Sequence, residues 1–420
     1  MKVLMIVTQF PYPKDNGKKI ILSNIIEYFI DKYGLKNIEL IVVGDNPLNV
    51  SNVKITAKFY KKPSSYIQLK NVIFYSLLLR RKSIQESVLY NEFNRRDIIK
   101  TIEQGNYDIV IYDTVRISQL FENNKFKNTK EFVYLDDLFS IRYEKMLKTM
   151  NEFPKIKFNV LGNFAKFLPK YITKLVSFKI INKYLLKYEQ NIIKKREVET
   201  ANIFPNALLI SQEETNILNS LTKKATVKSI RPVVESNKSE YYRDYKGEPN
   251  FIFLGALNVP HNSVSVHNFL KVNIKKIVER IPNAKIKIIG TNPNFELREF
   301  ANRFPDQVEL MGYVENLDQL FNRSCAMIIP LLFGSGVKLK TLESFSRGLP
   351  IITTEYGIEG IDLPLNGECI VENNIENYVL HMEKLLDPTY NEEVSNLAYS
   401  YFCNNYTKEK VYQQYDRLFK

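Results

Sequence analysis

The residues with the clearest chemical potential lie between Pro330 and Glu343, where an apolar run ends and an amphipathic segment begins. Gly334, Ser335 and Gly336 open this stretch, and glycines allow a ligand to approach the backbone closely. Backbone N–H groups at the start of a helix bind phosphate oxygens because they have no partner within the helix. The pattern therefore indicates a site for an anionic ligand at this turn.

Charged side chains follow the glycines. Lys338 and Lys340 fall in the first turn of a helix predicted at 337–346, where the helix dipole disfavours cations, so a bound anion would offset that cost. Glu343 comes next, and an acidic side chain there can accept hydrogen bonds from two ribose hydroxyls. Together these residues predict a pocket for a nucleoside diphosphate. The glycines alone would fit an ordinary turn before an amphipathic helix better.

Three aspartates near strand ends are candidates for proton transfer. Asp113 follows an apolar run at 108–112, and Asp136 and Asp137 follow another at 132–135. A carboxylate at such a position can act as a general base on a bound substrate. The alternative for each aspartate is a helix cap or a turn.

Short apolar runs alternate with helical patterns along the whole chain. Several runs are continuous Val, Ile and Leu, as in parallel strands buried on both faces. The runs lie at 2–7, 38–43, 108–112, 132–135, 251–254, 285–289, 327–330 and 349–353, with helical patterns such as 20–32, 264–281 and 337–346 between them. The alternation predicts an α/β fold of doubly wound, Rossmann-like layers.

A polar stretch rich in turn formers divides the chain near 232–249, and an apolar run at 250–254 restarts the alternation. We therefore expect an N-terminal Rossmann-like domain over 1–235 and a second one over 250–400. Residues 401–420 are predicted to form a C-terminal helix that packs back toward the first domain. Ligands of such folds bind at the carboxyl ends of the strands, so the two domains are expected to face each other across a cleft.

Composition excludes several classes of protein. Three scattered cysteines and three histidines predict neither a disulfide scaffold nor a metal centre. No uncharged apolar stretch is long enough to span a bilayer, and the first residues lack the apolar core of a signal peptide. We therefore expect a cytoplasmic protein.

The net charge of +13 suits an anionic partner, although a generally lysine-rich composition would also produce it. Lys166, Lys170 and Lys174 recur every four residues within 151–196, with apolar side chains between them. This is typical of a basic amphipathic helix on an anionic membrane, here the inner face of the cell membrane. The alternative is a long surface helix with solvated lysines. No nucleic-acid-binding motif is present, and no nucleic-acid partner is expected.

The stretch from Gly334 to Thr354 resembles the donor-site signature of the group 1 (family 4) glycosyltransferases of the GT-B fold. Further matches stand in the expected order at Pro11…Gly17, Asp136–Tyr143, Phe253–Asn262, Ile288–Gly290 and Gly312–Val314. The resemblance covers nearly the whole chain and is strongest over 250–365. Such enzymes retain anomeric configuration, need no metal or cofactor, and move a sugar from a nucleoside-diphosphate sugar to an acceptor.

By this resemblance, the donor is a UDP- or GDP-sugar and the acceptor is a polysaccharide, a lipid-linked glycan or another glycan. The implied catalytic residues are Asp113, Asp137 and His261. The implied donor contacts are Gly17, Gly255, Asn258, Gly312, Tyr313, Val314, Ser335, Gly336, Val337, Lys338, Lys340 and Glu343.

Two departures from the family pattern matter. Ser335 stands where many members have a glutamate near the donor sugar, and 256–262 offers none of the cations usual after the first strand of the C-terminal domain. Lys338 and Lys340 are therefore expected to carry the pyrophosphate charge. The departures favour an alternative, a catalytically silent relative that binds acceptor or supports a partner glycosyltransferase. A nucleotide-dependent epimerase of the same fold is a further alternative.

Overall fold

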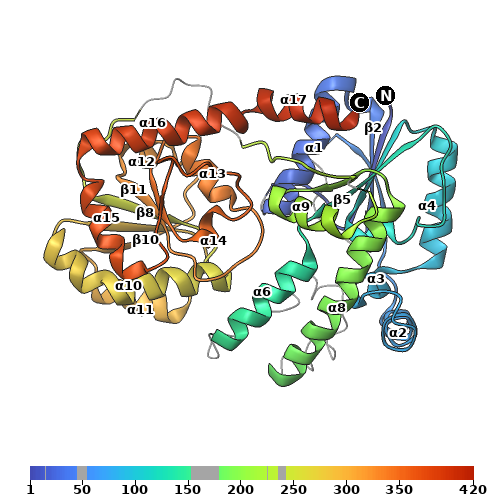
Figure 1. Cartoon of the computed structure of the whole chain (residues 1–420), viewed down its shortest axis with the longest axis horizontal. Coiled ribbons are helices and arrows are strands. Elements are labelled where there is room, and N and C mark those ends of the chain that lie inside the picture. The colour runs from blue at the N-terminus through green and yellow to red at the C-terminus, as the bar shows by residue number, and fades with distance from the viewer. Residues whose placement is uncertain (15, 45–53, 153–178, 225, 235–242) are drawn as a thin grey trace. The chain divides into compact units, whose positions relative to one another are not determined.

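The computed structural model describes residues 1–14, 16–44, 54–152, 179–224, 226–234 and 243–420. They form two compact units (Figure 1). Unit 1 takes in Met1–Glu152, the described residues from Lys179 to Pro232, and Tyr415–Lys420; unit 2 holds the described residues from Val233 to Gln414. The segment 153–178, with the lysines of the predicted membrane helix, lies outside the described residues.

Unit 1 is built on a seven-stranded parallel sheet in the order β3-β2-β1-β4-β5-β6-β7. The strands are β1 (Val3–Val7), β2 (Ile38–Val43), β3 (Thr56–Tyr60), β4 (Ile109–Asp113), β5 (Lys130–Asp136), β6 (Ala207–Leu209) and β7 (Val227–Ser229). Crossovers in opposite directions from the centre place helices on both faces, so every residue of β1 and β4 is buried (Figure 1).

The helices of unit 1 start at residues suited to capping. Asn16 accepts a hydrogen bond from the Lys19 amide at the start of α1, and Ser83 and Glu86 form a reciprocal capping box on α3. The helices are α1 (Gly17–Tyr33), α2 (Ser65–Asn71), the π-helix η2 (Val72–Leu78), α3 (Ile84–Leu89), α4 (Glu92–Gly105), α5 (Thr114–Ser118), α6 (Phe139–Glu152), α8 (Lys179–Ile203) and α9 (Gln212–Leu221).

The end of the chain belongs to unit 1. The last helix, α17 (Lys408–Phe419), brings Tyr415 and Phe419 onto α1 and the sheet. The Tyr415 ring centroid lies 5.3 Å from that of Tyr28, and the Phe419 centroid lies 4.9 Å from those of Phe29 and Phe132. These buried aromatic contacts hold the terminus in place.

Unit 2 has a six-stranded parallel sheet in the order β10-β9-β8-β11-β12-β13. The strands are β8 (Asn250–Leu254), β9 (Lys285–Ile289), β10 (Val308–Gly312), β11 (Ala326–Ile329), β12 (Ile351–Thr353) and β13 (Ile370–Val371). The helices are α10 (Pro260–Arg280), α11 (Phe295–Arg303), α12 (Asp318–Arg323), α13 (Leu339–Phe345), α14 (Glu355–Ile358), α15 (Tyr378–Lys384) and α16 (Pro388–Asn405). One apolar core lies under α10, α11 and α15 and another under α12, α13 and α16.

The predicted α/β fold of two doubly wound layers is confirmed. Five strands were not predicted, namely β3, β6, β7, β10 and β13. β6 and β7 have only three residues each, too few to mark a strand, and β3 is an edge strand with mostly exposed or half-buried side chains. No helix in the described part of the chain is long and apolar enough to cross a membrane.

Candidate functional site

The loop after β11 is fixed at its first residues by buried hydroxyl groups. The Thr354 hydroxyl donates to the Leu331 carbonyl oxygen at 2.5 Å, and the Ser265 hydroxyl accepts from the Leu332 amide at 3.1 Å. The chain then turns through Gly334 and Gly336, and Gly336 has a φ of 74°, in the left-handed region that favours glycine. The glycine turn predicted from the sequence is therefore held on a rigid base.

The helix after this turn begins later than predicted. α13 starts at Leu339 rather than at residue 337, and Lys338 is its N-cap. Lys338 is buried, and its Nζ donates to the Gly336 carbonyl oxygen at 2.6 Å and lies 3.9 Å from a Glu359 oxygen. The backbone amides of Gly334, Ser335 and Gly336 therefore lie in the loop before α13 and not in the helix itself.

Lys340 reaches across to the turn that follows β8. Its Nζ donates to Asn262 Oδ1 at 2.7 Å and lies 4.8 Å from the Phe253 ring centroid. A Cβ on Gly255 would come within 2.8 Å of Asn262 Nδ2 and 2.9 Å of this Nζ, so a larger residue at 255 would displace both side chains. The sequence places no cation between 256 and 262, and the tertiary structure brings one there from α13.

The electrostatics of Lys340 are unusual for a lysine. Burial, with a smaller contribution from the positive charge of Lys338, lowers the pKa of Lys340 to about 7. Its two contacts are an amide oxygen and an aromatic ring, neither of which is a counter-ion. An anion bound at this point would restore the charged form of the side chain.

The turns after neighbouring strands of unit 2 pack tightly against one another. A Cβ on Gly290 would lie 2.0 Å from the Gly255 carbonyl oxygen, and the Gly290 amide donates to the Gly312 carbonyl oxygen at 2.8 Å. Gly255 and Asn258 follow β8 while Gly312, Tyr313 and Val314 end or follow β10, so these predicted residues share one sheet edge. Asn258 and Tyr313 are exposed there.

His261 lies in the first turn of α10, close to the glycine loop. A Cβ built on Gly334 would stand 4.0 Å from His261 Cγ and 3.6 Å from Lys338 Nζ. The structure thus gathers Gly255, His261, Gly334, Lys338 and Lys340 from three separate stretches of unit 2. Ser335, Gly336 and Val337 lie in the same loop and are half-buried.

Glu343 lies one turn into α13 and is half-buried. Burial raises its pKa, nearby Arg347 opposes this effect, and Asp318 adds to it. Arg347 Nη1 is 3.6 Å from a Glu343 oxygen, while Arg347 Nε donates to Asp318 at 2.8 Å. Arg347 was not among the predicted site residues. Its position four residues after Glu343 on a helix indicates an ion pair between the two side chains.

Asp113 in unit 1 is engaged in a buried ion pair. One of its oxygens lies 2.7 Å from Lys18 Nζ, and the other accepts from the Thr8 hydroxyl at 2.6 Å and the Thr8 amide at 2.9 Å. Burial alone would raise the pKa of Asp113, but Lys18 and Arg116 outweigh it and lower the pKa. The carboxylate ties β1 to β4 and to α1, which begins at Gly17.

Asp136 and Asp137 end β5 in a similar setting. Asp136 has a φ of 71° and accepts from the Tyr134 hydroxyl at 2.8 Å, and its pKa is raised by burial and by Asp137. Asp137 accepts from Arg142 Nε at 2.7 Å. Lys18, which acts on Asp136, was not predicted as a site residue because it lies far from that aspartate in sequence.

Comparison with known proteins is consistent with this geometry. Residues 248–388 match a family model described as Glycosyl transferases group 1. A Klebsiella pneumoniae protein described as an uncharacterized 44.6 kDa protein in the cps region is 26% identical over 243 residues, which are 56% of this chain. The match spans 61% of that relative's length.

Several solved structures share the fold across the whole chain. TarM, from S. aureus, has a TM-score of 0.64 at 12% identity and covers 100% of this chain and 99% of its own. The lipopolysaccharide outer core galactosyltransferase WaaB in its apo form has a TM-score of 0.63 at 14% identity, with coverage of 100% and 99%. Anabaena Alr3699/HepE in complex with UDP and glucose has a TM-score of 0.59 at 12% identity, with coverage of 99% and 98%. At these identities the similarity shows a common GT-B fold.

Proposed function

We propose that the chain transfers a sugar from a nucleoside-diphosphate sugar to a glycan acceptor, because it has a GT-B fold and its residues 248–388 match the model described as Glycosyl transferases group 1. The observation that carries the proposal is the position of Lys340. Its ammonium group lies beside the turn after β8, on the same helix as Glu343, and no carboxylate among the described residues contacts it. Donor binding would supply the missing negative charge.

In this proposal the diphosphate lies against the glycine loop at 334–336 and the turn at Gly255, with Lys338 and Lys340 as its cations. The ribose hydroxyls donate to Glu343, and the base lies near Gly312, Tyr313 and Val314. The complex of HepE with UDP and glucose makes a UDP-sugar the first donor to test, with a GDP-sugar as the second.

The chemistry requires charge stabilisation on the leaving group. As the bond from the anomeric carbon to the phosphate oxygen breaks, negative charge grows on the diphosphate, and fixed ammonium and amide groups lower the barrier. The two lysines can supply this stabilisation without a metal. The departing phosphate then accepts the acceptor proton on the face that it leaves, which gives retention of anomeric configuration. His261 is proposed to contact the sugar or the phosphate.

The candidate catalytic and donor-binding residues of unit 1 differ in how well their contacts suit these roles. Asp137 and Gly17 remain proposed contacts for the reacting groups. Asp113 is less suited to act as a base, because its pKa is lowered and both of its oxygens are engaged by Lys18 and Thr8.

The proposed acceptor is a cell-surface polysaccharide or its lipid-linked precursor. The Klebsiella relative is described by its place in a cps region, and WaaB is described as acting on the lipopolysaccharide outer core. A cytoplasmic location at the inner face of the membrane accords with such an acceptor.

Thermal-shift screening against UDP-, GDP-, ADP- and TDP-sugars tests donor binding. We expect one class to stabilise the protein and Glu343→Ala to abolish that stabilisation, while the control Glu299→Ala on α11 leaves it unchanged. An unchanged shift in Glu343→Ala removes Glu343 as the ribose ligand. Tight donor binding without sugar transfer to any glycan or water would favour the silent relative, for which the serine at 335 is the supporting observation.

A further inference from the structure

In the helical segment 65–78, formed by α2 and η2, polar side chains are buried and large apolar side chains are exposed. Gln68, Asn71 and Ser76 are buried, with at most 8% of each side chain exposed. The apolar side chains of the segment and of the residue after it point outward instead. They are Tyr66, Ile67, Ile73, Phe74, Leu77, Leu78 and Leu79, with exposed fractions from 40% for Ile67 to 77% for Tyr66. A contiguous apolar surface of this kind marks an interaction site.

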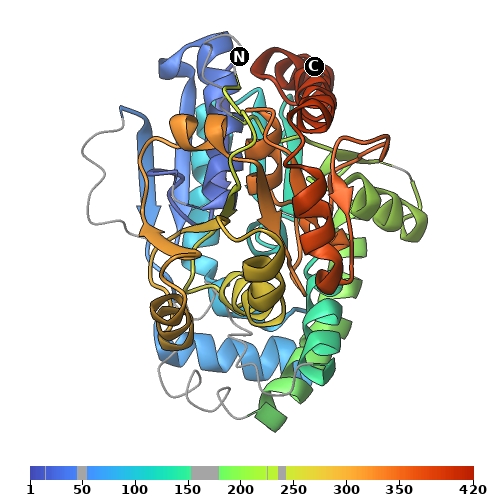
Figure 2. The ribbon, with the colours of Figure 1, turned by 90° about the vertical axis from the view of Figure 1, so that its left-hand side faces the viewer.

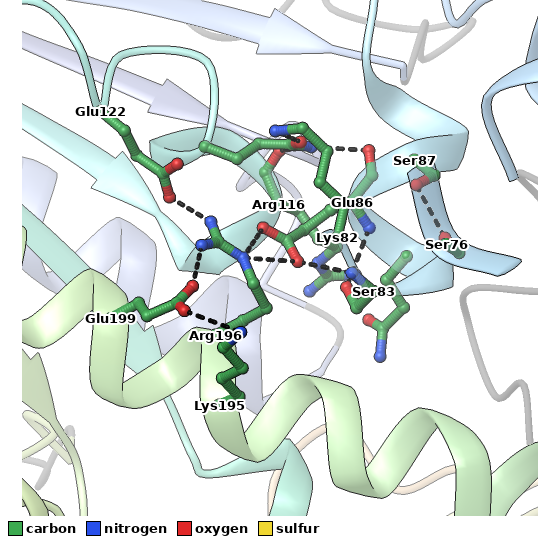
Figure 3. A network of polar contacts seen from close by, with 12 residues as sticks. Ser76, Lys82, Ser83, Glu86, Ser87, Arg116, Glu122, Lys195, Arg196 and Glu199 are labelled. Atoms are coloured by element: carbon green, nitrogen blue, oxygen red, sulfur yellow. Dashed lines mark hydrogen bonds and ion pairs between the residues drawn. The ribbon is translucent and has the colours of Figure 1, made fainter. Parts of the chain in front are cut away.

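Hydrogen bonds fix this orientation. Asn71 Nδ2 donates to the Tyr90 carbonyl oxygen at 2.8 Å and to the Ser87 carbonyl oxygen at 3.2 Å. The Ser76 and Ser87 hydroxyls lie 2.8 Å apart (Figure 3). Turning the helix to bury its apolar side chains would take Asn71 and Ser76 away from the Ser87 and Tyr90 groups that they contact, and a buried polar group left without a hydrogen bond is costly. The apolar surface is therefore a stable feature of the fold.

The helix underneath is itself held firmly. Glu86 of α3 accepts from Arg196 Nε of α8 at 2.9 Å, and Arg196 also contacts Glu122 and Glu199 (Figure 3). Glu189 of α8 accepts from the Ile84 amide at the start of α3 at 2.8 Å. This buried network gives the exposed segment a rigid platform within unit 1.

Positive charge flanks the apolar surface at both ends. Lys61, Lys62, Lys70, Arg80 and Arg81 are all exposed, and the sequence contains no acidic residue from Lys61 to Gln85. A second copy of this chain would meet the segment with the same positive charge, so self-association through it is disfavoured. Anionic lipid headgroups over a hydrocarbon layer complement both the charge and the apolar face.

We propose that residues 61–81 dock unit 1 on an anionic membrane surface. The helix lies along an outer edge of unit 1, as both ribbon views show (Figures 1 and 2). Its 14 residues are roughly 20 Å long, enough for the apolar side chains to enter the headgroup layer side by side. The sequence had indicated 151–196 for membrane contact, so this assignment moves that contact to a different element. It is independent of the proposed transferase activity.

The absence of tryptophan from the chain allows a direct test. Phe74→Trp introduces a single tryptophan on the apolar surface, which can be excited selectively over the tyrosines, and Phe295→Trp introduces one at a site in unit 2 that is 70% exposed. With phosphatidylglycerol-containing vesicles we expect a blue-shifted emission for Phe74→Trp that lipids brominated on their chains quench. Phe295→Trp should show neither change, and vesicles of phosphatidylcholine alone should shift Phe74→Trp far less.

Sedimentation with the same vesicles separates the contribution of positive charge to membrane binding from that of the apolar side chains. Arg80→Ser with Arg81→Ser and, separately, Leu77→Ser with Leu78→Ser should each weaken binding by about tenfold or more. The control pair Lys223→Ser with Lys224→Ser, exposed just after the end of α9, should bind as the parent protein does. Circular dichroism and donor-induced thermal shifts, unchanged in all three pairs, show that neither folding nor the donor site is affected.

Three results would overturn the proposal. One is parent protein that does not bind anionic vesicles. Another is binding lost equally in the control pair, which would mean general adsorption by net charge. The third is binding that survives both replacements in 77–81, with the Phe74→Trp emission unshifted, which would place membrane contact elsewhere.

Discussion

Replacement of Lys340 by methionine is expected to stabilise the empty protein and to weaken donor binding at the same time. The fall of the Lys340 pKa from 10.5 to about 7 corresponds to about 5 kcal/mol of lost preference for the charged side chain in the folded state. Methionine has a similar length and carries no charge to desolvate. Loss of the hydrogen bond to Asn262 and of the contact with Phe253 offsets part of the gain, about 2–4 kcal/mol.

The net effect at pH 7 is a gain of about 1–3 kcal/mol, or roughly 2–12 °C in Tm. The unfolded chain binds a proton on Lys340 up to pH 10.5, whereas the folded chain releases it near pH 7. Stability conferred at this residue therefore rises with pH between these values, and the advantage of Lys340→Met should shrink over the same window. Calorimetry or thermal unfolding at pH 7 and pH 9 measures this difference.

Donor affinity should fall with rising pH, whereas the stability conferred at Lys340 rises. A bound diphosphate favours the charged lysine, so binding takes up a proton above pH 7 and donor affinity should fall by at most about tenfold per pH unit there. In Lys340→Met this pH dependence should disappear and affinity at pH 7 should fall by about tenfold or more. The exposed control Lys275→Met on α10 should keep both stability and affinity.

Titration calorimetry with the best UDP- or GDP-sugar at several pH values measures both the donor affinity and its pH dependence. A Lys340→Met protein that binds donor with parental affinity and parental pH dependence refutes the assignment of Lys340 to the diphosphate. A variant that is less stable than the parent at pH 7 refutes the reasoning from burial.

Three further predictions concern the scaffold. Gly290→Ala should destabilise unit 2 by about 2 kcal/mol or more, seen as a lower urea midpoint, because its Cβ would meet the Gly255 carbonyl oxygen at 2.0 Å; parental stability would contradict the tight turn. Arg196→Met should lower the free energy of unfolding by about 3–5 kcal/mol, because it leaves the buried Glu86 carboxylate without its cation. Adding Glu86→Gln should recover part of that loss in a double-mutant cycle. Burial raises the pKa of Glu197 to about 8, so the folded state holds a proton that the unfolded state releases above about 4.5, and stability should fall between these pH values. Glu197→Gln should flatten that fall in urea unfolding at pH 5, 6.5 and 8, and an unchanged slope would assign it to other groups.

The sequence determined the α/β class and the position of the glycine loop, because both depend on local patterns. Continuous apolar runs mark strands buried on both faces, and glycines at 334 and 336 mark a turn whatever surrounds it. Short strands such as β6 were missed because three residues carry too little periodicity. The start of α13 was placed at residue 337, two residues too early, because the N-cap is Lys338, a residue type without a capping preference.

The tertiary structure alone decided where charged and apolar side chains act. Lys340 contacts Asn262 after β8, although the two residues are far apart in sequence. Because β8 and β11 are neighbours in the sheet, α13 lies beside that turn. The outward apolar face of 65–78 depends on Asn71 and Ser76 finding partners on α3 and its flanking residues. Periodicity along a helix reveals that two faces differ, but which face is buried depends on the partners that the rest of the fold supplies.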